Sequence, residues 1–86
     1  MHRAEALRIL ASWVMTLQLM PPEDPDYADA ARRKIEAAAE ALRCGASAET
    51  VQRMGQFSPL EIRRVRQLAL APTDSWDALN QRRYNG

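Results

Sequence analysis

The chain has 86 residues, a hydrophobic fraction of 47% and a formal net charge of +1. A chain of this length makes one domain with a small core, and it is too apolar to belong to the intrinsically disordered class. Its single cysteine, Cys44, excludes an internal disulfide and a cysteine-rich zinc site. Because it also lacks a phosphate loop, a dinucleotide fingerprint, a serine elbow and a metal-ligand cluster, we expect neither an enzyme nor a cofactor.

Alanine, leucine and arginine dominate the composition and β-branched residues are few, which favours helices over strands. The sequence therefore predicts an all-α fold, a compact bundle of four to five helices that forms a single domain over residues 1–86. The helices are expected at about 3–20, 27–43, 47–54 and 59–71, with a short last one at 75–82.

The first predicted helix, 3–20, is apolar nearly all round and carries almost no charge from residue 9 onward. Such a helix needs cover on several sides, and the rest of so short a chain supplies little of it. We therefore predict a homodimer formed through this helix, with an interface of Leu10, Trp13, Val14 and Leu17. The apolar run is too short to span a bilayer, so we expect a cytoplasmic protein without membrane contact.

An acidic, proline-rich connection leads to the second predicted helix, 27–43, for which Asp26 is the expected cap. Its inward stripe is expected to be small, formed by Ala31, Ile35, Ala38 and Leu42. The run Arg32-Arg33-Lys34 is interpreted as a solvated face. Gly45, two residues after Arg43, is expected to end the helix in a left-handed conformation.

The third predicted helix begins after Ser47, and the fourth begins with a capping box in which Ser58 is the cap and Glu61 lies three residues on. Phe57 and Ile62 have the spacing of a hydrophobic staple across this start. The fourth helix is expected to bury Ile62, Val65 and either Leu68 or Ala69. Beyond it, Trp76 and Leu79 are expected to cover the core.

Two short helices joined at a glycine turn invite comparison with a DNA-reading helix-turn-helix. The pattern fails in detail, since Glu61 and Arg64 fall where that motif buries apolar residues. Eleven of the twelve basic residues are arginine, a side chain suited to carboxylate and phosphate contacts. Those expected to contact nucleic acid or a partner protein are Arg53, Arg63, Arg64 and Arg66.

The order of these features resembles the FlhD family, one half of the bacterial flagellar master regulator. One block of resemblance runs from Ser12 to Met20, with a serine, an aromatic residue, an aliphatic run and a glutamine. The second combines Arg43-Cys44-Gly45 with Met54 and Phe57, then Ser58 and Ile62-Arg63-Arg64-Val65. The chain departs from the family by extra residues at 21–35, by a threonine near the family's later cysteine, and by a short C-terminal part.

The resemblance implies a helical homodimer that joins a zinc-bearing FlhC-like partner and activates transcription at DNA. The short C-terminal part implies that this chain alone binds DNA weakly and with strong salt dependence. The alternative reading is a protein-interaction module, such as an anti-activator, an adaptor or a phage-encoded inhibitor of a transcription factor, without DNA binding.

Overall fold

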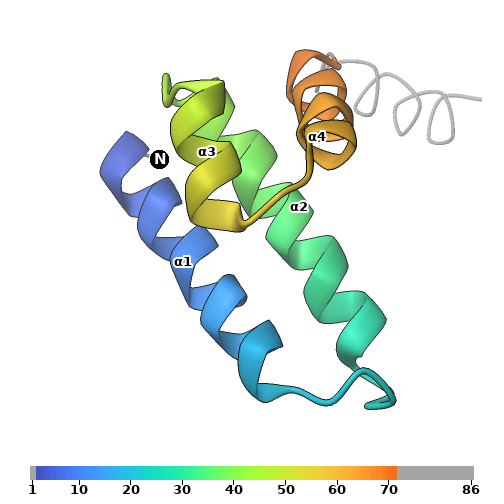
Figure 1. Cartoon of the computed structure of the whole chain (residues 1–86). Coiled ribbons are helices and arrows are strands. Elements are labelled where there is room, and N and C mark those ends of the chain that lie inside the picture. Colours follow the sequence, from blue (N-terminus) through green and yellow to red (C-terminus); the bar gives the residue numbers. More distant parts are fainter. Residues whose placement is uncertain (1, 72–86) are drawn as a thin grey trace, which may run out of the picture.

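Within residues 2–71, four helices form close to their predicted positions (Figure 1): α1 (Arg3–Leu19), α2 (Tyr27–Arg43), α3 (Ala48–Gly55) and α4 (Pro59–Leu70). The computed structural model describes residues 2–71, and no strand occurs among them. The all-α fold class predicted from the sequence is therefore confirmed. The last predicted helix, 75–82, and its residues Trp76 and Leu79 lie outside the described residues.

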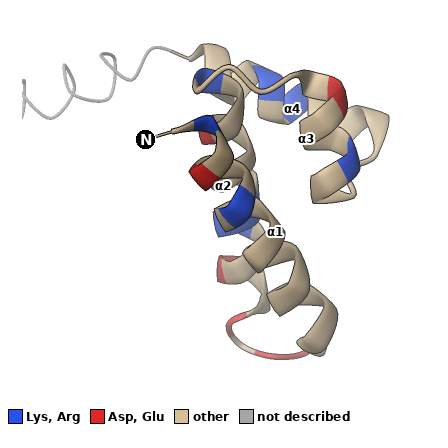
Figure 2. Ribbon diagram, turned by 90° about the vertical axis from the view of Figure 1, so that its left-hand side faces the viewer, with Lys and Arg blue, Asp and Glu red and all other residues tan. Residues whose placement is uncertain are grey.

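The helices α1 and α2 form an antiparallel pair joined by the acidic connection at one end of the molecule, and α3 and α4 lie toward the other end (Figure 1). Helix α3 packs against each of the other three, whereas α1 and α4 flank α2 without packing against each other. The arrangement places the acidic connection far from the arginines of α4 (Figure 2).

The centre of the bundle is α2, which packs against α1, α3 and α4. Its buried residues are all alanines: Ala30, Ala37, Ala38, Ala39 and Ala41. Because successive residues are about 100° apart on a helix, three consecutive buried alanines span about 200° of its circumference. The predicted stripe is therefore too narrow: Ala38 is buried, Ile35 and Leu42 are half-buried and pack against the core, and Ala31 is half-buried.

Larger side chains from the other helices fill the space around these alanines. The core cluster includes Leu10 of α1, Val51 of α3, and Ile62 and Val65 of α4, with Phe57 between the last two helices. Alanine lets helix axes approach closely but contributes little buried area of its own, so these few large residues carry most of the hydrophobic stabilisation. Of the two candidates on α4, Ala69 is half-buried and Leu68 is exposed.

The predicted helix starts and stops are mostly confirmed. The Ser58 and Ser47 hydroxyls accept hydrogen bonds from the Glu61 and Thr50 N–H groups, both at 3.1 Å. Gly45 has a φ of +102°, the left-handed conformation expected after α2. Asp26 occupies the N-cap position of α2, but its side chain makes no capping hydrogen bond; its own N–H instead donates to Asp24 Oδ1 at 2.8 Å.

The capping box of α4 makes stability depend on pH. The Ser58 N–H donates to Glu61 Oε1 at 2.9 Å, and this bond holds the pKa of Glu61 below its ordinary value. A carboxylate with a depressed folded-state pKa stabilises the fold above its unfolded pKa and loses that contribution as pH falls through the folded value. We expect Ser58→Ala to lower the free energy of unfolding by about 1 kcal/mol at neutral pH.

The measurement is urea denaturation followed by circular dichroism at neutral and acidic pH. Glu61→Gln is expected to lie below the wild type at neutral pH and to converge with it under acid, where the wild-type carboxylate is protonated. Glu49→Gln is the control, because that carboxylate lies in the first turn of α3 without a capping box. A difference between wild type and Glu61→Gln that stays constant with pH would contradict the assignment.

The corner between α3 and α4 has a left-handed residue, but it is Gln56, with a φ of +55°, and not the adjacent glycine. Gln56 N–H donates to the Arg53 carbonyl and Phe57 N–H to the Gln52 carbonyl, which together close α3 as a Schellman motif. Gly55 is required for another reason. A Cβ at this position would lie 2.2 Å from Cε2 of the Phe57 ring, so the ring occupies the space that a side chain would need.

Candidate interaction surfaces

Two basic residues of α2 interact with the C-terminal ends of other helices. Lys34 Nζ donates to the Gly55 carbonyl at the end of α3, at 2.9 Å, and lies 4.5 Å from the centroid of the Phe57 ring. Arg43 Nη2 and Nε donate to the carbonyls of Leu68 and Ala69 at 2.9 and 3.2 Å. A cation at a helix C-terminus is favourable because it meets the negative end of the helix dipole.

These contacts correct the interpretation of Arg32-Arg33-Lys34 as a solvated face, because Lys34 is half-buried between helices. The sequence offers no signal for either contact, since the partner carbonyls lie 21 and 25 or more residues away. Both side chains hold helices together, which leaves them unsuited to bind a partner. The basic residues that a partner could contact are therefore other ones than Lys34 and Arg43.

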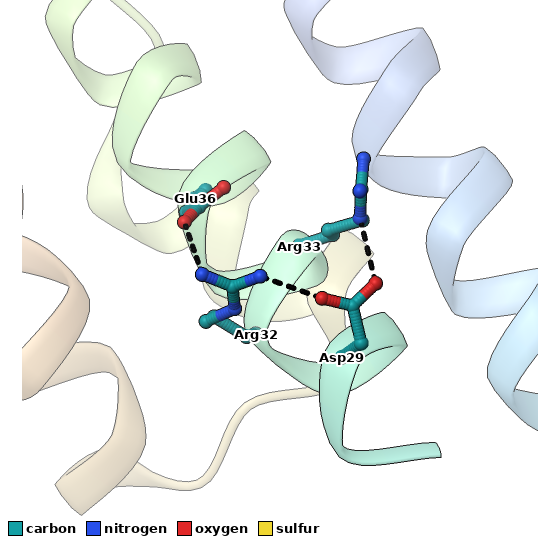
Figure 3. A network of polar contacts seen from close by, with 4 residues as sticks. All are labelled: Asp29, Arg32, Arg33 and Glu36. Carbon is teal, nitrogen blue, oxygen red and sulfur yellow. Dashed lines mark hydrogen bonds and ion pairs between the residues drawn. The ribbon is translucent and has the colours of Figure 1, made fainter. Parts of the chain in front are cut away.

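The other two members of that run form an exposed network on α2 with Asp29 and Glu36 (Figure 3). Arg32 Nη2 and Arg33 Nε donate to the two carboxylate oxygens of Asp29 at 2.6 and 2.9 Å. The Arg32 and Arg33 guanidinium groups hold the pKa of Asp29 below its ordinary value. Exposed pairs contribute little to stability, so the consequence of this network is orientation.

The network orients Arg33 toward α1, where its guanidinium carbon lies 5.7 Å from the centroid of the Trp13 ring. Trp13 is half-buried, in a seam between α1 and α2. Its outer side is therefore partly covered by a cation from within the same chain. A partner that contacts Trp13 meets this arginine as well.

The residues predicted to form a dimer interface on α1 fall into two groups. Leu10 and Val14 are buried within the chain's own core, whereas Trp13 and Leu17 are half-buried. A second copy can therefore contact Trp13 and Leu17. It cannot contact Leu10 or Val14 while α1 stays packed on α2. The exposed large apolar residues of α1 are Met15 and Leu19, with exposed fractions of 63% and 85%.

The four arginines predicted to contact nucleic acid or a partner are all exposed. Arg53 belongs to α3, and Arg63, Arg64 and Arg66 belong to α4, where Arg66 lies one turn after the buried Ile62. Within residues 2–71, ion pairs involve other arginines, namely Arg32, Arg33 and Arg43. The four-arginine set, Arg53, Arg63, Arg64 and Arg66, is thus exposed and outside these ion pairs.

Sequence reasoning missed that leucines interrupt this basic surface. Leu60, Leu68 and Leu70 of α4 are exposed, the last with an exposed fraction of 81%. Leu60, Arg64 and Leu68 are spaced by four residues and so share one line along the helix. This four-residue spacing is visible in the sequence. Leu68 also lies three residues after the buried Val65, however, which fits a buried position equally well, so periodicity alone does not predict that Leu68 is exposed.

A cleft of about 310 Å³ opens where the C-terminal ends of α2 and α4 meet the start of α3. It is lined by Leu42, Arg43, Ala48, Arg66, Ala69 and Leu70. A second, smaller cleft of about 250 Å³ lies between the start of α1 and the residues that join α2 to α3. Neither cleft was predicted, because each is formed by helix ends that are distant in the sequence.

The described residues contain no group of three or more histidine, cysteine, aspartate or glutamate side chains that could hold a metal ion. Cys44 is half-buried at the end of α2, where its thiol lies 3.7 Å from a carboxylate oxygen of Glu40. None of the helices in the part of the chain that the structure describes has the length and apolar character needed to cross a bilayer.

Comparisons with protein-family models, with curated proteins and with solved structures found no match to this chain.

Proposed function

We propose that the chain is a small FlhD-like transcriptional regulator subunit that acts as a dimer with a partner protein at DNA. The observation that carries the proposal is the four-arginine set, which is exposed on α3 and α4 and forms no ion pair within residues 2–71. Arginines of this kind contact phosphates and so position a protein on DNA without reading its sequence. The partner, a zinc-bearing FlhC-like protein, is proposed from the family resemblance alone.

The charge distribution supports the same proposal. The acidic residues of the connection between α1 and α2 lie at the end of the molecule opposite α4 (Figure 2). A chain with a net charge of only +1 can therefore present a basic end to a polyanion while its acidic end points away. This charge asymmetry favours encounters in which α4 faces the DNA and the acidic connection faces away from it.

The dimer is proposed to form through the accessible apolar residues of α1, which lie on two sides of the helix: the half-buried Trp13 and Leu17 on one side and the exposed Met15 and Leu19 on the opposite side. An apolar surface of this kind is removed from water when a second copy of α1 packs on it, which provides the driving force for association. Sedimentation equilibrium is the direct measurement. A chain that remains monomeric at all concentrations would contradict this part of the proposal.

We predict that the triple variant Arg63→Ala, Arg64→Ala, Arg66→Ala loses most of the affinity of the full chain for duplex DNA. Each DNA phosphate that the protein neutralises adds to the salt dependence of binding, so removing an arginine from a phosphate makes that dependence weaker. The slope of log K against log salt is therefore expected to become shallower by about 0.9 for each such phosphate. The measurement is fluorescence anisotropy of a labelled duplex between about 50 and 200 mM salt, the range over which phosphate neutralisation changes affinity strongly.

The matched control is the triple variant Arg3→Ala, Arg8→Ala, Arg32→Ala, which removes the same charge from exposed positions on α1 and α2. It is expected to bind DNA almost as the wild type does. Circular dichroism verifies that both variants fold. Equal affinities for the two triple variants would show that only net charge matters and would overturn the assignment of α4 as the DNA surface.

A second candidate function, a protein-interaction module without DNA binding, is favoured by the leucines exposed among the arginines. The side chains of Leu60 and Leu68 cannot pair with phosphates, whereas a protein interface typically has an apolar centre and is enriched in arginine. The double variant Leu60→Ser, Leu68→Ser discriminates the two functions. It is expected to leave DNA affinity unchanged under the first proposal and to abolish capture of the protein partner under the second.

A further inference from the structure

Among the residues that the structure describes, the cleft between α2, α3 and α4 combines an apolar lining with one available cation. Leu42 and Ala69 are half-buried in its wall, and Leu70 is largely exposed at its edge. Arg43 is occupied, because its Nε and Nη2 donate to the two α4 carbonyls and its Nη1 donates to Glu40 Oε2 at 3.4 Å. Arg66 is the remaining cation, and it forms no ion pair within residues 2–71.

The segment of this chain that follows α4 has the complementary composition. Residues 72–81 contain two aspartates, Asp74 and Asp77, together with Trp76 and Leu79, and no basic residue. An indole is the side chain with the largest apolar area to bury, and a neighbouring carboxylate can pair with a guanidinium in the bidentate geometry that arginine favours.

The position of the cleft also fits this segment. Leu70, which lines the cleft, is six residues before Trp76, and Ala71 is the last residue described. Five residues span at most about 18 Å when fully extended, a length that allows Trp76 to reach the cleft edge from Ala71. A contact within one chain forms at an effective concentration of about millimolar, which favours it over the same contact from a separate molecule.

We propose that the segment 72–81 docks in this cleft of its own chain, with Trp76 against Leu42, Ala69 and Leu70 and with Asp74 or Asp77 paired to Arg66. Docking covers one member of the four-arginine set. In a consequence that rests on the proposed function, the segment competes with DNA for Arg66 and so restrains binding by the isolated chain.

The test uses the full chain with fluorotryptophan at both tryptophan positions and fluorine NMR as the readout. The Trp76 signal is assigned by its loss in Trp76→Phe. Arg66→Glu and Leu70→Ser are each expected to shift the Trp76 signal to the position it has in urea, while the Trp13 signal stays unchanged. Arg63→Glu and Leu60→Ser are the matched controls, because they change the same residue types on α4 outside the cleft, and they leave Trp76 unaffected.

A charge swap distinguishes a direct pair from a general effect. Adding Asp74→Arg and Asp77→Arg to Arg66→Glu is expected to restore the wild-type position of the Trp76 signal. The proposal is overturned if Trp76 of the wild type already has its signal at the urea position, or if the cleft variants and their controls behave alike. A Trp76 signal that moves on dilution overturns docking within one chain and assigns the cleft to a second copy.

These outcomes are independent of DNA binding, since no nucleic acid is present in the NMR experiment. Failure of the arginine variants to alter DNA affinity would remove the proposed function and leave the docked segment intact. Conversely, an exposed Trp76 would remove the docked segment and leave the four-arginine set available for DNA.

Discussion

Leu10→Ala is expected to lower the free energy of unfolding by about 2–5 kcal/mol, the range for removing a fully buried leucine side chain. Leu10 has an exposed fraction of 0%, and many of its neighbours in the core cluster are alanines. Alanine has no flexible side chain that could move into the cavity, so we expect a cost toward the upper end of that range. A domain of this size has a total stability of roughly 4–13 kcal/mol, so the variant is close to unfolding.

The matched control is Leu19→Ala in the same helix, because Leu19 has an exposed fraction of 85%. A single chain is expected to tolerate this change within about 0.5 kcal/mol. Urea denaturation at several protein concentrations measures both variants. If Leu10→Ala does not fold, Leu10→Met, with an expected cost below about 1.5 kcal/mol, tests the same site. Equal effects at the two leucines would contradict the packing of α1 on α2.

The control also bears on the proposed dimer. If a second copy covers the accessible side of α1, the cost of Leu19→Ala grows with protein concentration, since association stabilises only the covered form. The cost of Leu10→Ala stays constant, because Leu10 is buried within one chain. A cost that depends on protein concentration therefore indicates burial in an interface, and a constant cost indicates burial within the domain.

Gly55→Ala is expected to lower the free energy of unfolding by about 1–3 kcal/mol, the usual cost of overpacking. At an exposed helical position the same change stabilises, since alanine favours the helix by up to about 1 kcal/mol. Here the new Cβ meets Cε2 and Cδ2 of Phe57 at 2.2 and 2.6 Å. The ring has little room to move, because it is buried and the Lys34 amine lies above it.

A double-mutant cycle with Phe57→Leu identifies the cause. The alanine is expected to cost less when the ring is absent, although Phe57→Leu is itself destabilising. Gly45→Ala is the control, because no atom lies within 4 Å of its Cβ position and its strain comes from a φ of +102° alone. Its cost of about 1–2 kcal/mol is expected to be the same with either residue at position 57. A stabilising Gly55→Ala would contradict the corner geometry.

The sequence by itself determined the helices and most of their ends. The capping box of Ser58 and Glu61, the cap of Ser47 and the left-handed Gly45 are formed by residues within a few positions of each other. Local hydrogen-bonding groups and backbone preferences decide such features, so they can be identified without knowledge of the fold. The exposure of the four-arginine set follows in part from the same helical periodicity.

Only the tertiary structure decided which helix is central, which cations are available and where the clefts lie. The charged residues of α2 mark its outer face, but alanine is compatible with a core and with a surface, so the sequence does not show how much of the remaining circumference is buried. The tertiary arrangement brings Lys34 to α3 and Arg43 to α4, and it places the Phe57 ring where Gly55 lacks a side chain. The Lys34 and Arg43 contacts depend on distances between helix ends, which the order of residues along a helix does not specify.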